Sequence, residues 1–343
     1  MKPIRILVAD DSLTMRSALV ALLGEEHGLQ IVGQARDGVE AVQKARALRP
    51  DVITMDVNMP RLDGLGATAA IMAESPSRVL MVCQVSEERQ LDLSFRAMAA
   101  GALEVLPKPG PGPHELRLFG ARIAEAVRLM AEVPVVRRHR AFAFHEGPKA
   151  HPAGVGAIGI VASTGGPPAL TVVLRSLPAG LPAPIFIAQH IAAGFTPGLL
   201  RWLGEVSESQ VRVAKDGEVP AAGVVYLPPD GCDLEIDPQG IVRTPASNGV
   251  HVPNGNRLLH SIAKVYGPRS VGVVLTGMGD DGAQGLLAIR HAGGATYAQD
   301  EASCVVFGMP SAARALGATD TLVPVDGIGP LLAGLCARGM KAQ

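Results

Sequence analysis

The sequence predicts an α/β protein of two doubly wound parallel-sheet domains, the second carrying a small β-hairpin insertion. Three observations support this fold class. The chain has 343 residues, more than a single hydrophobic core usually serves. Short β-branched runs alternate with stretches of helical periodicity in two separate parts of the chain, which is typical of parallel sheets. Hydrophobic residues make up 48% of the chain and charged residues 18%, a balance that excludes a largely disordered protein.

The first alternating array runs from Ile4 to about Met130 and predicts five strands and five helices. The expected strands are short runs rich in Val, Ile and Leu: Ile4–Ala9, Ile31–Ala35, Val52–Met55, Val79–Val82 and Leu103–Leu106. The expected helices repeat apolar residues every three or four positions: Thr14–Leu23, Val39–Leu48, Leu65–Ala73, Glu87–Ala100 and Glu115–Met130.

A linker is expected between the two arrays. Periodicity disappears between residues 132 and 153, where Pro and Gly accumulate beside a short basic cluster, Arg137–Arg140. We interpret that cluster as a solvated stretch rather than a nucleic-acid contact. The predicted boundaries are therefore 1–131 for the first domain, 132–153 for the linker and 154–343 for the second domain.

The second array predicts six strands and five helices. The expected strands are Ala157–Ala162, Pro184–Gln189, Val211–Ala214, Ser270–Leu275, Ala295–Ala298 and Thr321–Val323. The expected helices are Pro168–Ser176, Thr196–Gly204, Arg257–Tyr266, Gly282–Ala292 and Ile328–Ala337. Pro-Pro-Asp-Gly and Pro-Gln-Gly turns within Val224–Arg243 indicate the β-hairpin insertion.

Charge and composition exclude several classes of protein. Lys and Arg number 31 and Asp and Glu 32, so the net charge of −1 gives no general attraction to nucleic acids or anionic membranes. The four cysteines show no paired spacing, which fits a reducing compartment. No uninterrupted apolar run approaches the about 20 residues that span a bilayer, and the start of the chain lacks a signal peptide's apolar segment. We therefore expect a cytoplasmic protein without membrane insertion.

Four charged residues follow strands of the first predicted sheet. Asp10 and Asp11 come after the first strand, Asp56 after the third and Lys108 after the fifth. Because the carboxyl ends of parallel strands share one edge, three carboxylates would repel one another there unless a hard cation such as Mg²⁺ lay among them. Lys108 would then pair with a phosphoryl group. An isolated Asp-Asp-Ser would more simply cap a helix, but the matching strand ends favour the cation site.

A serine, a histidine and two aspartates follow strands of the second predicted sheet. Ser163 begins a Ser-Thr-Gly-Gly-Pro turn, His190 follows the second strand, and Asp280 and Asp281 follow Ser270–Leu275. A serine hydroxyl needs a histidine to remove its proton, and that histidine needs a carboxylate to orient it. Each residue alone has a structural explanation, as a turn, a core histidine or a helix cap. The order Ser, His, Asp and the lack of a Gly-x-Ser-x-Gly elbow disfavour an ordinary α/β-hydrolase.

The first domain resembles the flavodoxin-like receiver domain of two-component response regulators. The resemblance covers Ile4 to Met130 and rests on Asp10-Asp11, the Asp56-Val-Asn-Met-Pro-Arg-Leu-Asp-Gly loop and the Lys108-Pro pair. It implies that Asp56 accepts a phosphoryl group from a histidine kinase. It also implies that Asp10, Asp11 and Asp56 hold Mg²⁺ and that Lys108 contacts the phosphoryl oxygens.

Two positions depart from the receiver pattern. Cys83 stands where the family usually has Ser or Thr, and Val105 replaces the usual aromatic residue. A thiol is a poor hydrogen-bond donor, so we expect phosphorylation of Asp56 to activate the protein incompletely.

The second domain extends the resemblance to the CheB family of chemotaxis protein-glutamate methylesterases. The motifs are Ala-Ser-Thr-Gly-Gly-Pro at Ser163, Gln-His-Ile at His190, Leu-Thr-Gly-Met-Gly-Asp-Asp-Gly-Ala, and Gln-Asp-Glu-Ala-Ser-Cys-Val-Val-Phe-Gly-Met-Pro. The family motif Gly-Met-Gly-x-Asp-Gly implies a catalytic Asp281, with Asp280 at the variable position. The resemblance implies a Rossmann-like esterase domain. One departure is Pro253-Asn-Gly-Asn, where the family usually reads Pro-Ser-Val-Asp.

By this resemblance the protein is a phosphorylation-gated esterase. Ser163 would attack a γ-glutamyl methyl ester on a chemoreceptor (a methyl-accepting chemotaxis protein), with the Met278 amide as oxyanion donor and Thr164 in support. The same chemistry on a glutamine side chain would make it a deamidase. The implied partners are chemoreceptors and, as phosphodonor, the histidine kinase CheA. The implied cofactor is Mg²⁺ in the receiver domain, and none for the esterase.

Other interpretations receive less support. A DNA-binding output domain generally needs a basic face, whereas residues 153–343 contain 12 Lys and Arg against 14 Asp and Glu. A pseudoenzyme that only binds receptors would not need the full set of Ser163, His190 and Asp281. The Gly154-Val-Gly-Ala-Ile-Gly stretch precedes its strand, whereas a dinucleotide fingerprint follows one. His251 and His260 lack further ligands at metal-binding spacing, so no zinc site is predicted.

Overall fold

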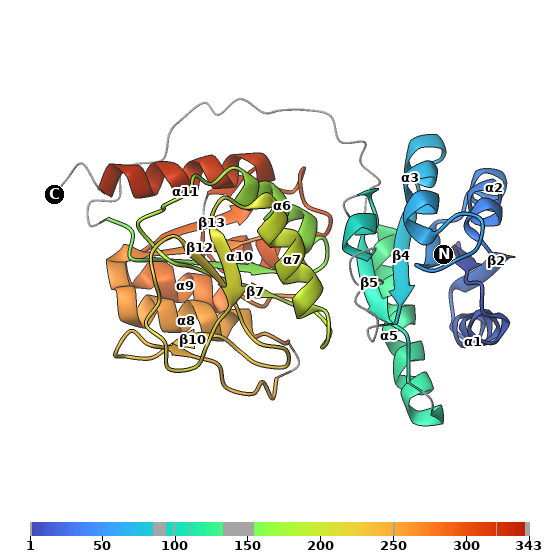
Figure 1. Ribbon diagram of the computed structural model, residues 1–343, viewed down its shortest axis with the longest axis horizontal. Helices are drawn as coiled ribbons and strands as arrows, with labels where there is room; N and C mark the ends of the chain where they lie inside the picture. The colour runs from blue at the N-terminus through green and yellow to red at the C-terminus, as the bar shows by residue number, and fades with distance from the viewer. Residues whose placement is uncertain are drawn as a thin grey trace. The chain divides into compact units, whose positions relative to one another are not determined.

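The computed structural model describes residues 2–84, 94–98, 100–110, 112–132, 154–249, 251–319 and 321–339. The chain divides into two compact units, residues 1–138 and 139–343, each built around one large sheet (Figure 1). The boundaries 1–131, 132–153 and 154–343 stay a prediction, because nearly all of the expected linker lies outside the described residues.

The first unit contains a five-stranded parallel sheet in the order β2-β1-β3-β4-β5. Its elements are β1 (Ile4–Ala9), α1 (Leu13–Gly24), β2 (Leu29–Ala35), α2 (Gly38–Leu48), β3 (Val52–Asp56), α3 (Gly64–Glu74), β4 (Arg78–Cys83), β5 (Glu104–Pro107) and α5 (Pro113–Glu132). The five predicted strands are confirmed. Of the helix expected over 87–100, the structure describes residues 94–98 and 100, which are helical.

Helices α1 and α5 cover one face of this sheet. Leu19 and Leu23 of α1 and Ile123 and Val127 of α5 are buried in one cluster with residues of β1 and β4. β1 lies between β2 and β3, so the direction in which the chain adds strands reverses there. Ligands of doubly wound sheets bind at the carboxyl side of such a reversal, here beyond the ends of β1 and β3.

The second unit contains a seven-stranded parallel sheet in the order β14-β13-β12-β6-β7-β9-β8. Its strands are β6 (Ala157–Ala162), β7 (Ile185–Gln189), β8 (Gln210–Val213), β9 (Val224–Leu227), β12 (Ser270–Val274), β13 (Ala295–Gln299) and β14 (Leu322–Val323). Its helices are α6 (Gly166–Arg175), α7 (Thr196–Val206), α8 (Gly255–Tyr266), η1 (Gly267–Arg269), α9 (Ala283–His291), α10 (Met309–Ala315) and α11 (Val325–Gly339). The predicted fold class of two parallel-sheet α/β domains is confirmed.

The sequence-based extent of the β-hairpin insertion is wrong at its start. Val224–Leu227 is β9, which pairs in parallel with β7 and β8 and so belongs to the main sheet. The antiparallel pair is confined to β10 (Glu235–Ile236) and β11 (Val242–Arg243). The Pro-Pro-Asp-Gly turn therefore leads out of the main sheet instead of closing a hairpin.

Helices cover both faces of the large sheet. Figure 1 shows α6 and α11 over one face and α8 and α9 over the other. On the second face, α8, α9 and α10 bury Leu259, Leu286 and Met309 in one cluster with Val161 of β6 and Phe186 of β7. The order of strands reverses between β6 and β12, so their carboxyl ends are the expected place for a ligand. Among the described residues, no helix combines the length and apolarity needed to cross a bilayer.

Candidate active site

The first unit gathers its acidic residues at the carboxyl ends of β1 and β3. Carboxylate oxygens of Asp10, Asp11 and Asp56 all lie within 4.8 Å of one another. Asp10 and Asp56 are buried, and Asp11 is exposed at the edge of the cluster. Lys108 Nζ lies 2.9 Å from Asp10 Oδ2 and 2.8 Å from Asp56 Oδ2. The structure therefore brings all four predicted residues together.

The capping interpretation of Asp10 and Asp11 is wrong. Ser12 caps α1, because its hydroxyl oxygen accepts a hydrogen bond from the Met15 amide at 3.3 Å. The Asp10 carboxylate instead accepts from the Ser12 amide at 2.9 Å. The remaining carboxylate oxygens of the cluster are thereby left for Lys108 and for a ligand.

The electrostatics of this cluster fit a divalent cation. Burial and the nearby Asp10 charge raise the pKa of Asp56 to about 6, against the opposing effect of the Lys108 ammonium. Three ionised carboxylates carry three negative charges, and Lys108 supplies one positive charge. Oxygen ligands with this excess of negative charge suit Mg²⁺, which would favour the ionised form of each carboxylate.

In the second unit, the backbone around Ser163 is held by neighbouring strands. Its amide donates to Thr276 O beyond β12 at 3.0 Å, and its carbonyl accepts from Gln189 Nε2 at 2.9 Å and from the Gly166 amide at 2.7 Å. Gly277 is required beside it, since a Cβ there would lie 2.6 Å from Ser163 Cβ. These contacts fix Ser163 at the strand reversal.

His190 occupies the neighbouring strand end. Ala162 pairs with Gln189, so the two residues that follow them, Ser163 and His190, leave adjacent strands about 4.8 Å apart. The His190 amide donates to Ala162 O at 2.9 Å. Among the described residues, no hydrogen bond joins the Ser163 hydroxyl to His190. Catalytic hydrogen bonds often tighten only when substrate is bound, so this arrangement is compatible with a nucleophile and its base.

Asp281 holds the His190 ring. His190 Nε2 lies 2.7 Å from Asp281 Oδ2, which leaves Nδ1 as the nitrogen available to Ser163. The side chain of His190 is 13% exposed and that of Asp281 is 1% exposed. Asp280, in contrast, is exposed and makes no ion pair among the described residues. Of the two adjacent aspartates, therefore, Asp281 has the position of a triad carboxylate.

The start of α8 stabilises the Asp281 carboxylate. The Gly255 and Asn256 amides donate to it at 2.6 and 2.9 Å, and the Gly282 amide donates at 3.0 Å. Burial alone would raise the pKa of Asp281, but the hydrogen bond and charge of His190 and the Asn256 and Gly255 amides outweigh burial and lower that pKa. A helix N-terminus favours a negative charge because its first backbone N–H groups have no partner within the helix and point toward that charge. Asp281 is therefore suited to stabilise an imidazolium.

Two backbone amides near Ser163 are available to an oxyanion. Among the described residues, neither the Met278 amide nor the Thr164 amide has a hydrogen-bond acceptor. The carbonyl of Gly277, next to Met278, accepts from the Met309 amide at 2.9 Å, which anchors the loop. Thr276 Oγ1 donates to Thr164 O at 3.0 Å and so joins the two loops.

The Pro253-Asn-Gly-Asn departure has a structural explanation. Asn254 caps α8, because its side-chain oxygen accepts from the Arg257 amide at 2.8 Å. The side-chain oxygen of Asn256 accepts a hydrogen bond from the Gly285 backbone amide of α9 at 2.8 Å, and the Asn256 backbone amide donates to the Asp281 carboxylate. At Gly255 a Cβ would lie 2.2 Å from Val161 Cγ1, so this chain needs glycine there.

Replacing Gly255 by alanine should therefore destabilise the second unit and impair catalysis. The added Cβ would also lie 3.0 Å from Asp281 Oδ2. Overpacking of a close-packed site costs about 1–3 kcal/mol, and we expect a lower melting temperature with at least a roughly tenfold loss of esterase activity. Gly204→Ala is the matched control, since a Cβ at that helical position meets nothing within 4 Å. Wild-type melting and activity of Gly255→Ala would show that the close packing is not required.

Sequence reasoning missed the residues that hold these loops. Gln189 Nε2 donates to the carbonyls of Ser163 and His190 at 2.9 and 2.8 Å. Gln299 Oε1 accepts from the Thr276 amide at 2.8 Å. Both glutamines lie at strand ends and within the motifs that carried the family resemblance, which was the available signal. A further contact not foreseen is the stacking of His251 on the His190 ring.

Together the two units define a response regulator with a hydrolase-like output domain. Residues 6–118 match the response regulator receiver domain model, and residues 158–332 match the CheB methylesterase model. The chain belongs to the CheB methylesterase family. Receiver domains in general bind Mg²⁺ for phosphorylation, and the first unit contains the acidic cluster of Asp10, Asp11 and Asp56.

Relatives match along nearly the whole chain. A protein-glutamate methylesterase/protein-glutamine glutaminase of Myxococcus xanthus is 54% identical over 336 residues, 98% of this chain and 94% of that protein. A protein of the same name from Anaeromyxobacter dehalogenans is 44% identical, and the match covers 96% of this chain and 98% of that protein. The crystal structure of the Thermotoga maritima CheB methylesterase catalytic domain is 35% identical with a TM-score of 0.51, covering 53% of this chain and 99% of that one.

Proposed function

We propose that the protein hydrolyses γ-glutamyl methyl esters of chemoreceptors, deamidates receptor glutamines, and is regulated by phosphorylation of Asp56. The observation that supports the esterase activity is the contact of His190 with the buried Asp281, which places the His190 ring one strand from Ser163 at the reversal of the large sheet. The names of the relatives support the choice of substrate. We place the protein in the cytoplasm, where it meets receptors and a CheA-type kinase.

The reaction follows from this geometry. His190 Nδ1 accepts the hydroxyl proton as Ser163 Oγ attacks the ester carbonyl, and Asp281 stabilises the resulting imidazolium. The Met278 amide, supported by the Thr164 amide, donates to the developing oxyanion. His190 then gives its proton to the departing methoxide, which leaves as methanol, and water hydrolyses the acyl-serine to glutamate by the same steps. With a glutamine side chain, ammonia leaves instead. Nucleophile, base and oxyanion donors all come from the chain, so we assign the esterase no cofactor.

In the first unit, Asp10, Asp11 and Asp56 would hold Mg²⁺, which neutralises charge on the incoming phosphoryl group. An Asp56 oxygen attacks the phosphorus of a kinase phosphohistidine, whose nitrogen leaves. Lys108, now paired with Asp10 and Asp56, would bind a phosphoryl oxygen.

Product analysis tests the proposed activity. Full-length protein is incubated with receptor that carries methyl esters at some sites and glutamine at others. We expect methanol and ammonia in solution, and glutamate at both kinds of site by mass spectrometry of receptor peptides. Unchanged receptor in the presence of phosphodonor and Mg²⁺ would refute the proposal.

Cys83 bears on the strength of the phosphorylation response. Its side chain is fully buried at the end of β4, burial raises its pKa to about 11, and it shares a hydrogen bond with Ser94. The Lys108 amide donates to Cys83 O at 2.7 Å, so residue 83 adjoins the phosphorylation site. Val105 is also buried, in β5. A thiol there is a weaker partner for a phosphoryl oxygen than the usual hydroxyl.

We therefore expect Cys83→Ser to increase the stimulation of esterase activity by a phosphodonor. A charge-assisted hydrogen bond contributes about 1.5–3 kcal/mol, of the about 5.5 kcal/mol needed to shift a two-state equilibrium from 1:99 to 99:1. We expect the receiver domain to inhibit the esterase until Asp56 is phosphorylated, so the activity of a fragment lacking residues 1–150 supplies the upper limit. Ser94→Ala tests whether the Ser94 hydroxyl already replaces the missing one. The sequence offers Ser86 as another nearby hydroxyl, but it lies outside the described residues. If the phosphorylated wild-type protein is already as active as the fragment, the expectation of incomplete activation is wrong.

A further inference from the structure

His251 lies against the face of the His190 ring. The two ring centroids are 5.0 Å apart and the planes differ by 12°, which is a stacked arrangement. His251 belongs to the loop between β11 and α8, and the Ile191 amide donates to Val252 O of that loop at 3.4 Å. In the part of the chain that the structure describes, the His251 side chain has no hydrogen-bond or ion-pair partner. The contact that the structure shows for the His251 ring is therefore its stacking on the His190 ring.

One hydrogen bond does not fix the orientation of an imidazole. The contact between His190 Nε2 and Asp281 Oδ2 holds one atom of the ring. The ring can still turn about that contact, because the outer torsion of a histidine side chain has a broad energy profile. A second ring packed on the face restricts this rotation. Asp281 and His251 thus constrain the edge and the face of the same ring.

We propose that His251 is a positioning residue, which acts by stacking on His190 and keeps Nδ1 directed for proton transfer with Ser163. The proposal rests on the function proposed above for His190. It gives His251 a role through its ring rather than through contact with the reacting atoms. The orientation of His190 matters when it removes the serine proton and again when water attacks, so both halves of the reaction depend on it.

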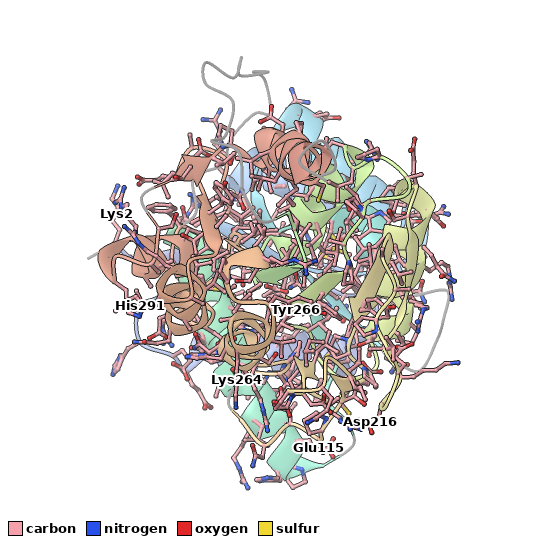
Figure 2. All side chains as sticks on the ribbon, turned by 90° about the vertical axis from the view of Figure 1, so that its left-hand side faces the viewer. Lys2, Glu115, Asp216, Lys264, Tyr266 and His291 are labelled. Atoms are coloured by element: carbon pink, nitrogen blue, oxygen red, sulfur yellow. The ribbon has the colours of Figure 1, made fainter. Side chains whose placement is uncertain are left out.

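Two substitutions test whether the aromatic face of His251, rather than its volume, is required. His251→Phe keeps an aromatic face, and His251→Leu keeps a similar volume without one. We expect His251→Leu to lower kcat about tenfold with KM unchanged, and His251→Phe to stay within about threefold of wild type. His291→Leu is the matched control, because His291 is an exposed histidine in the last turn of α9, labelled in Figure 2.

Two assays on the full-length protein distinguish this proposal from the proposed function. Methanol release gives kcat and KM, and the rate at which a fluorophosphonate labels Ser163 reports proton removal from the serine without any receptor. If wild type reacts with the fluorophosphonate but releases no methanol, the proposed substrate fails, and the labelling rates of the three variants still decide the role of His251.

The stacking role is supported if His251→Leu is slow in labelling, His251→Phe is close to wild type and His291→Leu is unchanged. It is overturned if His251→Leu labels at the wild-type rate, or if His251→Phe is as slow as His251→Leu. Thermal melting of each variant identifies any that fails to fold. Should His251→Leu do so, His251→Gln, which keeps a polar group without a ring, is judged by the same two criteria.

Discussion

Ser163→Ala should abolish methanol release from methylated receptor while leaving phosphorylation of Asp56 unchanged. Without the hydroxyl there is no nucleophile for His190 to activate, and loss of a triad nucleophile costs on the order of 10⁶ in kcat. The Ser163 side chain makes no hydrogen bond among the described residues, so its removal leaves no buried partner unsatisfied. We therefore expect the melting temperature to stay close to that of the wild type.

Phosphorylation is the internal control for this variant. Asp10, Asp56 and Lys108 lie in the first unit, so uptake of a phosphoryl group from a small-molecule phosphodonor should proceed at the wild-type rate. Residual esterase activity within tenfold of the wild type would contradict the assignment of Ser163 as the nucleophile.

Asp281→Asn should impair hydrolysis far more than Asp280→Asn. Asp281 alone of the two accepts a hydrogen bond from His190, and an amide there cannot neutralise the imidazolium or select the same tautomer. In serine proteases of another fold the equivalent change costs about 10⁴ in kcat, and we expect a loss of that order for Asp281→Asn. The exposed Asp280 should tolerate the change within about threefold.

The melting temperatures of the two variants separate catalysis from folding. Asp281 accepts from the Gly255 and Asn256 amides, so Asp281→Asn removes a charge from a helix N-terminus and should also lower stability. For this reason kcat is compared well below the melting temperature. Equal effects of the two substitutions would mean that the triad carboxylate has been placed at the wrong residue.

Much of the fold follows from local patterns in the sequence. Ile4–Ala9 and Ala157–Ala162 are short, mostly apolar runs, each followed directly by a polar residue, and both agree with the strands of the structure to the residue. Local patterns assign β9 to the hairpin, because the Pro-Pro-Asp-Gly turn that follows it is a local signal whereas its partner strand β7 is distant in sequence. Helix α10 was not predicted at all, since its seven residues complete only about two turns and show little periodicity.

The candidate site, like the fold, could be predicted only in part from the sequence. Ser163, His190 and the pair Asp280–Asp281 could be placed because each follows a strand, and the parallel topology brings strand ends together. The choice between the two aspartates came from the resemblance, and the structure supplies the physical difference in burial and hydrogen bonding. The stacking of His251 could not be predicted, because no periodicity specifies how a loop lies over a neighbouring ring.

The central claim is that one chain joins receiver chemistry at Asp56 to ester hydrolysis at Ser163. The most direct test is the rate of methanol release from methylated receptor by full-length protein, with and without a phosphodonor in the presence of Mg²⁺. We predict release in both cases, faster with phosphodonor, and no stimulation of Asp56→Asn. No methanol under either condition, or an equal rate with and without phosphodonor while Asp56 is demonstrably phosphorylated, would contradict this claim.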